Sequence, residues 1–289
     1  MAIESLRALM EASENRDICD VIIRSDCVDR GVTEEASFEK MRALYAAIRR
    51  AKAGYDPQLR SASGMVGGDG AKMRAYVQRG KTICGDYIGQ VIAQALEMGE
   101  SNACMKCIVA APTAGSCGVL PAVLLPYQAR EGLDDDTMVR AMYVAGAIGQ
   151  VVAAKASIAG AAGGCQAEIG TASAMGAAAL CYLGGGDAQA VCHAAAMAIK
   201  SMLGLVCDPI AGLVEVPCVK RNAAGAMIAM SSADMALAGI RSAVPPDEVI
   251  LAMREVGDKM DVSLKETGVG GVAGTPFGQK IAEAMENGG

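Results

Sequence analysis

A short loop with a cysteine at each end constrains the fold of this chain more than any other segment. The loop runs from Cys207 to Cys218 with the sequence CDPIAGLVEVPC, and its prolines and glycine exclude a regular helix. Both thiols can therefore turn toward one point. Some forty residues upstream, Cys165 follows a glycine pair. Three converging thiolates are one short of a closed four-cysteine site, which predicts an iron–sulfur cluster with one open, substrate-binding iron.

A second set of cysteines competes with the first. Cys104 and Cys107 have the two-residue spacing that is common in metal sites, and Cys117 could complete a set of three thiols. Spacing alone does not choose between the two sets. Local chemistry favours the first, because Gly163-Gly164 can present backbone N–H groups to a sulfide and Lys220-Arg221 can offset thiolate charge. An ordinary solvated patch is the alternative interpretation of that basic pair.

The composition favours helices packed at short distances. Hydrophobic residues make up 52% of the 289 residues, yet aromatic residues make up only 3% and tryptophan is absent. A core of Ala, Gly, Met, Leu and Val with few β-branched runs suits helices better than sheets. We expect an all-α fold with one domain over residues 1–289, packed around a buried iron–sulfur site with glycine-rich loops. Within it, residues 1–60 would form an N-terminal helical segment and residues 61–289 the cluster- and substrate-binding core.

Hydrophobic periodicity and stop signals predict the helices. Two glycine-rich loops interrupt them, at residues 61–70 and 267–275, and a short final helix follows the second loop. The predicted helices cover residues 3–14, 34–53, 86–98, 118–130, 136–156, 166–183, 187–205, 223–240 and 246–260.

Charge and targeting signals exclude several classes of protein. The net charge of −6 argues against a general affinity for nucleic acid or for an anionic membrane. The uncharged stretches 108–129 and 169–186 lack the Leu, Ile and Phe content of a membrane-spanning helix. The N-terminal residues contain no secretion signal. Eleven cysteines, an odd number, then indicate reduced thiols in the cytoplasm rather than a disulfide framework.

Several motifs resemble those of the iron–sulfur-dependent L-serine dehydratases. They are GAAGGCQAEIGTAS (160–173), GLVCDPIAGLVEVPCVKRNA (204–223), ETGVGGVAGTP (266–276), APTAGSCGVLPA (111–122) and GGDG (67–70). The resemblance covers nearly the whole chain. It is to the α chain of the two-chain form, which pairs with a separate β chain.

The resemblance implies that Cys165, Cys207 and Cys218 hold a [4Fe–4S] cluster. The other eight cysteines, Cys104 and Cys107 among them, are not ligands in the family pattern. Single-chain relatives end in a cysteine that can fill the fourth iron position at rest, whereas no cysteine follows Cys218 here. We therefore expect the fourth iron to be open, or bound by water or a partner group.

The implied reaction converts L-serine to pyruvate and ammonia. An open iron would act as a Lewis acid on the β-hydroxyl, and a positioned base would remove the α-proton. No residue here is assigned as that base. His193 is the single histidine, and a helix histidine at a core edge or subunit contact is its plainer interpretation. In the family the proposed catalytic histidine lies in the β portion, so we expect this chain to be inactive alone, with the β chain as partner and a homo-oligomer of α chains possible.

Glycine-rich loops are candidates for binding the serine carboxylate. Thr113, Gly115 and Ser116 precede the helix predicted from residue 118, where free N–H groups favour an anion. Further candidates are Gly67, Gly68, Gly270 and Gly271; a plain turn is the alternative for all of these loops.

Two other functional classes remain open from the sequence. A non-catalytic iron–sulfur sensor or cluster-binding module would need the same three thiolates, but no anion-binding loops and no labile iron. A purely structural helical subunit would use its cysteines as core residues. A pyridoxal phosphate enzyme is disfavoured, because neither Lys155 nor Lys220 stands in a convincing cofactor context.

Overall fold

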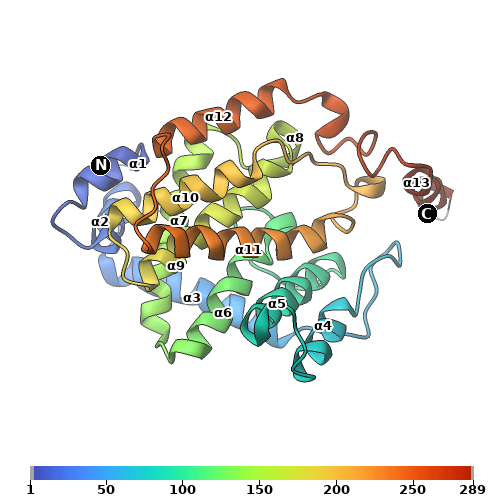
Figure 1. Cartoon of the computed structure of the whole chain (residues 1–289), viewed down its shortest axis with the longest axis horizontal. Coiled ribbons are helices and arrows are strands. Elements are labelled where there is room, and N and C mark those ends of the chain that lie inside the picture. Colours follow the sequence, from blue (N-terminus) through green and yellow to red (C-terminus); the bar gives the residue numbers. More distant parts are fainter. Residues whose placement is uncertain (1–2, 288–289) are drawn as a thin grey trace.

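The computed structural model describes residues 3–287 and contains helices joined by loops, with no β-strand among those residues (Figure 1). Four one-turn elements, η1 to η4, lie in the loops: Ala114–Ser116, Gln166–Gly170 (a π-helical turn), Ile210–Gly212 and Val262–Leu264. The helices are α1 (Leu6–Ala12), α2 (Ile18–Arg30), α3 (Glu34–Ala53), α4 (Asp69–Gln78), α5 (Gly85–Ala103), α6 (Val119–Glu131), α7 (Asp135–Lys155), α8 (Gly160–Gly163), α9 (Thr171–Leu183), α10 (Ala188–Met202), α11 (Cys218–Leu237), α12 (Pro246–Lys259) and α13 (Pro276–Asn287).

Helix α9 is the centre of the molecule. Every residue from Thr171 to Cys181 is buried, and the helix contacts α6, α7, α10 and α11. Its residues are mostly Ala, Gly and Ser, so neighbouring backbones can approach it closely. Gly225 of α11 shows how closely, because a Cβ there would lie 2.8 Å from Ile169 and 3.0 Å from Ser173. Small residues thus set the distances between the core helices, as the composition predicted.

The N-terminal helices share this core. Leu6, Ile22 and Tyr45 belong to the same hydrophobic cluster as Ile148 of α7. Helices α2 and α3 pack on α7, and α1 packs on α10. The prediction of a single all-α domain is therefore confirmed for the described residues, while the division at residue 60 is not visible as a break in the packing.

Helix α7 is long and apolar enough to span a membrane by length and composition. Two-thirds of its most apolar stretch (67%) is buried by the rest of the protein. Helices α2, α3 and α9 contact it, so it serves as a core helix.

Helices α2, α4 and the four-residue α8 were absent from the sequence prediction. No helix was predicted between residues 14 and 34, yet this segment forms α2, which buries Ile18, Cys19, Ile22 and Ile23. Its signals were present: Asp17 accepts hydrogen bonds from the amides of Cys19 and Asp20, and Gly31 ends the helix at φ 63°. The sequence analysis missed these signals because the apolar stripe of α2 is narrow and many of its residues are charged.

The predicted loop 61–70 was too long, and one helix start was wrong. Helix α4 begins at Asp69, so Gly70 is helical. Helix α11 begins at Cys218, not at residue 223, so the second cysteine of the loop lies in its first turn. Pro217 directly precedes this helix, at a position where a proline does not interrupt helical hydrogen bonds. The predicted helix over residues 34–53 has the observed bounds of α3.

Two glycine-to-alanine variants test the close packing. We expect Gly225→Ala to lower the free energy of unfolding by about 1–3 kcal/mol, because the new methyl group would overlap Ile169. Gly146→Ala is the matched control inside α7, where a Cβ has no neighbour within 4 Å, and it should raise stability by about 0.5–1 kcal/mol. Urea denaturation measures both. Equal effects of the two variants would contradict the account.

Candidate functional site

The three predicted cysteine ligands come from three separate segments and are all buried. Cys165 directly precedes the π-helical turn η2, Cys207 lies between α10 and η3, and Cys218 is the first residue of α11. Their residues are 2%, 2% and 7% exposed. A π-helical turn inside a helical segment is frequent at functional sites, and here it joins Cys165 to α9.

The buried amide of Gln166 joins the first cysteine to the segment before the second. Its Nε2 donates to the Met253 carbonyl at 2.9 Å, and its Oε1 accepts from the Gly204 amide at 3.0 Å. The backbone N–H of Gln166 also donates to the Leu205 carbonyl at 2.9 Å. These bonds fix Cys165 relative to the chain that leads into Cys207.

An enclosed ion pair joins the second cysteine to the third. Arg221, in the first turn of α11, pairs with Oδ1 of Asp208 at 2.9 Å and donates to the Val206 carbonyl at 2.8 Å. The Asp208 side chain is 4% exposed and the Arg221 side chain 18%. Oδ2 of Asp208 accepts from the amide of Val272 at 2.8 Å. One carboxylate thus connects both ends of the cysteine loop to the second glycine-rich loop.

Burial makes the three thiols hard to ionise in the absence of a metal. It raises the pKa of Cys165 to about 11 and that of Cys218 to about 12, and it raises the pKa of Cys207 as well. Negative charge on Cys165 raises the pKa of the other two further. Arg221 acts in the opposite direction on Cys165 and Cys218. The charge of Cys165 therefore acts on both other thiols, and one guanidinium acts on Cys165 and Cys218.

This donor set suits a cluster better than a single ion. In residues 3–287, no three His, Cys, Asp or Glu side chains are grouped closely enough to hold one metal ion. An iron–sulfur cluster binds each thiolate through a different iron, so its ligands need not surround one point. Buried thiols from three fixed segments, beside a cation, fit that requirement.

Glu168 lies between the first cysteine and the Thr113 loop. Its Oε1 accepts a hydrogen bond from the Thr113 hydroxyl at 2.7 Å, and its Oε2 lies 3.9 Å from the sulfur of Cys207. Burial raises the pKa of this carboxyl group. The sequence analysis missed Glu168, although it is the one charged residue between Lys155 and Asp187.

The predicted anion-binding residues Thr113, Gly115 and Ser116 surround this carboxylate. A Cβ on Gly115 would lie 3.5 Å from Oε1 of Glu168 and 3.4 Å from Val214 of the cysteine loop. Ser116 is fully buried and its hydroxyl accepts from the Thr113 amide at 3.3 Å. The structure thus brings this loop to the cysteines.

The loop with Gly67 and Gly68 reaches the site through acidic side chains. Glu215 of the cysteine loop accepts hydrogen bonds from the hydroxyls of Ser61 and Ser63. The amides of Asp69 and Gly70, at the start of α4, donate to Glu100 instead of remaining free for a ligand.

Gly270 and Gly271 lie on the other side of the cysteine loop. The Gly270 amide donates to the Ser263 carbonyl at 2.9 Å, and Gly271 lies directly against the Asp208 carboxylate. Cys207 exchanges backbone hydrogen bonds with this segment, donating to Leu264 and accepting from Glu266.

Two residues in these segments have left-handed backbones that glycine would adopt more easily. Ala211 has a φ of 54° and Glu266 a φ of 62°. Such conformations cost roughly 1–3 kcal/mol each and occur mainly at functional sites. Both residues flank the Cys207–Lys265 bridge.

His193 lies apart from the cysteines. It is in the first half of α10, about 14 Å along the helix from Met202 at the end that leads to Cys207. Its Nδ1 accepts from the Ser242 amide at 3.1 Å, and burial, with Arg241 and Lys200, lowers its pKa. The contact fits a structural histidine at a core edge.

The rival cysteine set is not brought together. Cys107 is exposed and Cys104 is half-buried beside α5. Cys117 is fully buried, and its thiol contacts the Met98 carbonyl at 3.7 Å.

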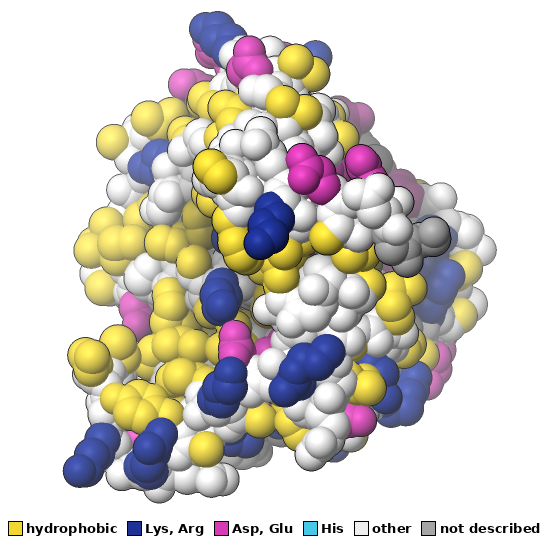
Figure 2. All heavy atoms as spheres, turned by 90° about the vertical axis from the view of Figure 1, so that its right-hand side faces the viewer, with side chains coloured by type: hydrophobic (Ala, Val, Ile, Leu, Met, Phe, Trp, Pro, Cys, Tyr) yellow, Lys and Arg dark blue, Asp and Glu magenta, His cyan; other side chains and the backbone are white. Residues whose placement is uncertain are grey.

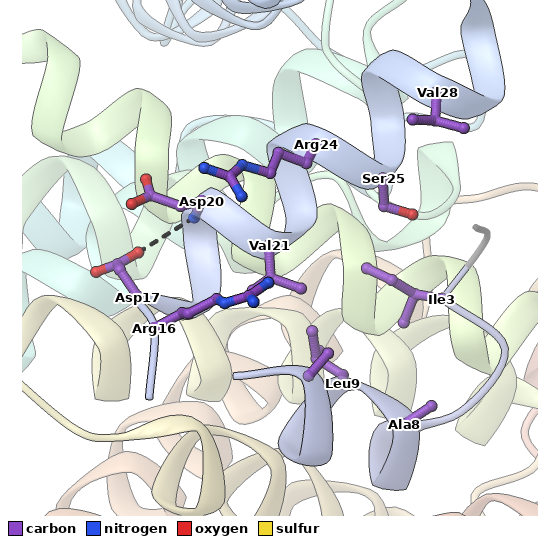
Figure 3. Close-up of a pocket in the computed structure, with 11 residues that line it drawn as sticks. Ile3, Ala8, Leu9, Arg16, Asp17, Asp20, Val21, Arg24, Ser25 and Val28 are labelled. Atoms are coloured by element: carbon purple, nitrogen blue, oxygen red, sulfur yellow. Dashed lines mark hydrogen bonds between the residues drawn. The ribbon is translucent and has the colours of Figure 1, made fainter. Parts of the chain in front are cut away.

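A separate groove between α1 and α2 contains none of the predicted site residues. It has a volume of about 390 Å³. Figure 3 shows Ile3 and Leu9 facing Val21 across it, with the Asp17 carboxylate accepting from the Asp20 amide at the end of the groove.

Comparison with known proteins agrees with the motifs. The family model described as "Serine dehydratase alpha chain" matches residues 5–273. The chain is 44% identical over 290 residues to "Probable L-serine dehydratase, alpha chain" of Bacillus subtilis (strain 168), covering 98% of this chain and 95% of the relative. It is 50% identical over 217 residues to "L-serine dehydratase, alpha chain" of Peptoniphilus asaccharolyticus, covering 75% of this chain and 74% of that one.

Longer relatives match as well. "L-serine dehydratase 1" of Escherichia coli (strain K12) is 44% identical over 183 residues, which cover 62% of this chain and 40% of the relative. Most of that longer protein therefore lies outside the matched region.

The enclosed ion pair predicts unequal effects of two charge removals. We expect Asp208→Asn to lower the free energy of unfolding by about 3 kcal/mol or more, because it leaves Arg221 without its counterion. The matched control is Lys220→Ala, whose ion pair with Asp69 is exposed at the lysine and should contribute less than about 1 kcal/mol. Chemical denaturation of the purified chain measures both, and similar losses would contradict this assignment.

The lowered pKa of His193 predicts a pH dependence. The neutral imidazole stabilises the fold fully above its ordinary pKa of 6.5, and this stabilisation is lost as the pH falls through the lower value of the folded state. His193→Asn keeps an acceptor for the Ser242 amide but does not titrate. Between pH 7 and pH 5, the wild-type chain should lose stability relative to this variant; parallel curves would refute the prediction.

Proposed function

This chain belongs to the serine dehydratase alpha chain family, and from that membership we propose that it is the α chain of an iron–sulfur-dependent L-serine dehydratase. In this proposal it is a lyase (an L-serine ammonia-lyase) that converts L-serine to pyruvate and ammonia in the cytoplasm, as part of serine degradation that can feed gluconeogenesis.

One observation carries the cofactor assignment. Cys165, Cys207 and Cys218 come from three segments, are buried together, and influence one another's ionisation beside Arg221. When bound there, a [4Fe–4S] cluster with an open iron would supply a Lewis acid for the β-hydroxyl. Gln166 and Asp208 would hold the three ligands in place, because each connects two of the cysteine segments.

The protein's own groups would bind the rest of the substrate. We assign the serine carboxylate to the loop of Thr113, Gly115 and Ser116, which lies against the cysteine loop and precedes α6. Gly67 and Gly68 would contribute through their own loop, whose Ser61 donates to Glu215 of the cysteine loop, and Gly270 and Gly271 would contribute from the opposite side. The buried surroundings would exclude bulk water from the reacting atoms.

The general base is assigned to a separate β chain. His193 lies far from the cysteines and its Nδ1 is engaged by Ser242. The longer relatives are compatible with a split arrangement, since the region they share with this chain covers only 40% of the length of one of them. We expect no role for nucleic acid or a membrane, and association of α chains with one another is compatible with the proposal.

The face beside the cysteine loop offers a place for such a partner. The exposed side chains of Val262, Val269, Val272 and Phe277 lie on either side of Lys265, which pairs with Cys207. Figure 2 views the molecule from the side of α13 and shows hydrophobic side chains interspersed with charged ones over this face. Exposed apolar groups of this kind are typical of contact surfaces.

Cysteine variants test the cofactor assignment. After anaerobic loading with iron and sulfide, we expect Cys165→Ala, Cys207→Ala and Cys218→Ala each to lose most of the bound iron and the visible absorption of the cluster. The double variant Cys104→Ala/Cys107→Ala should retain both. Iron and sulfide analysis per chain is the measurement, and full iron content in any of the first three would contradict the assignment.

L-serine separates the enzyme from a sensor. Addition of L-serine to the loaded protein should change the cluster spectrum, because the substrate would bind next to an open iron. A cluster that is present but indifferent to L-serine would favour a non-catalytic cluster-binding module.

A further inference from the structure

The carboxylate of Glu168 is the most unusual charged group around the cysteines. It is half-buried, yet no Lys or Arg among residues 3–287 forms an ion pair with it. Enclosed charges are normally paired, because removal from water is costly without a counterion. Arg221, the cation beside the cysteines that could pair with Glu168, is already paired with Asp208.

The two oxygens of Glu168 differ in their partners. Oε1 accepts from the Thr113 hydroxyl at 2.7 Å, while Oε2 has only the long 3.9 Å contact with the thiol of Cys207. A thiol is a weak donor, so Oε2 keeps capacity for a strong one.

Glycines pack directly against this carboxylate. A Cβ on Gly160 would lie 2.9 Å from Oε2 and 2.7 Å from the Cys207 sulfur, and a Cβ on Gly115 would lie 3.5 Å from Oε1. A side chain at position 160 would therefore clash with both the carboxylate and the cysteine, so the glycine is what lets these two groups lie side by side.

Neighbouring carboxylates already have charged or hydrogen-bonding partners. Asp208 is paired with Arg221 and accepts from the Val272 amide, and Glu215 accepts from two serine hydroxyls. Glu100 accepts from the amides that begin α4 and from the Tyr55 hydroxyl. Glu266 is exposed. Glu168 is therefore the half-buried acid beside the cysteines that has no ion pair and no strong donor to one of its oxygens.

We infer that Glu168 binds the α-ammonium group of the amino-acid substrate through Oε2. The Thr113 hydroxyl holds the Glu168 carboxylate in position by donating to Oε1. This inference rests on the proposed function, since it assigns the third polar group of L-serine after the hydroxyl and the carboxylate. The substrate ammonium supplies the missing counterion. Glu168 is then a specificity residue that separates amino acids from hydroxy acids of the same shape.

A comparison of two ligands in two enzymes tests the inference. L-serine and 3-hydroxypropanoate differ in the ammonium group, and Glu168→Gln removes the charge while keeping an oxygen for Thr113. The complete enzyme consumes L-serine, so affinity is measured on the iron- and sulfide-loaded α chain in complex with its β chain from the rapid change of the cluster spectrum on anaerobic mixing, before pyruvate accumulates. We expect Glu168→Gln to weaken L-serine binding roughly ten- to one-hundred-fold, and 3-hydroxypropanoate binding by less than about threefold.

Two further variants keep the result interpretable. Glu255→Gln removes an exposed carboxylate of α12 that is paired with Lys259, and it should leave the affinity for both ligands unchanged. If Glu168→Gln does not retain iron, Glu168→Asp is used in its place. It preserves the charge but moves the carboxylate oxygens away from the substrate ammonium, so it too should weaken the binding of L-serine more than that of 3-hydroxypropanoate. Iron content and the spectrum without ligand are recorded for every variant.

The outcomes are distinct. Equal weakening of both ligands, or an altered iron spectrum before ligand is added, would make Glu168 a structural residue or an iron ligand and overturn the inference. Unchanged L-serine affinity would overturn it as well. Failure of the proposed function has a different signature, because the wild-type complex itself would then neither bind L-serine nor form pyruvate.

Discussion

The enclosed pair between Asp208 and Arg221 is the interaction on which the candidate site depends. Arg221 belongs to the first turn of α11, three residues after Cys218, and Asp208 directly follows Cys207. The same aspartate accepts from Val272 in the second glycine-rich loop. Without this pair, the cysteine loop would have no charged connection between its two ends, and the guanidinium that favours ionised thiols would lose its place.

The carboxylates around the cysteines divide into two kinds. Glu100, Glu215 and Asp208 act within the protein, where they satisfy amides, hydroxyls and one arginine. Each holds together segments that are far apart in the sequence. Glu168 is half-buried, has no ion pair, and has one oxygen that lacks a strong donor. This contrast is the physical basis for assigning it to a ligand and the others to structure.

The sequence was sufficient for the fold class and for the segments that meet at the site. Ala- and Gly-rich helices with few aromatic residues imply close helix packing, and the cysteine motifs identify the loops around them. Helix α2 escaped prediction because a charged surface helix buries only a narrow stripe. Helix α4 also escaped prediction, because glycines precede it and its first amide donates to Glu100, which is distant in the sequence. Partners separated by tens of residues, such as Glu168 and Thr113, follow from tertiary structure and could not be predicted from spacing.

The central claim is that this chain supplies the cluster and most of the substrate site, while a second chain supplies the base. Its most direct test is pyruvate formation from L-serine after anaerobic loading with iron and sulfide, first with this chain alone and then with its β chain. The account predicts pyruvate only when both chains are present. Pyruvate from this chain alone would contradict the split active site and require a base among its own residues.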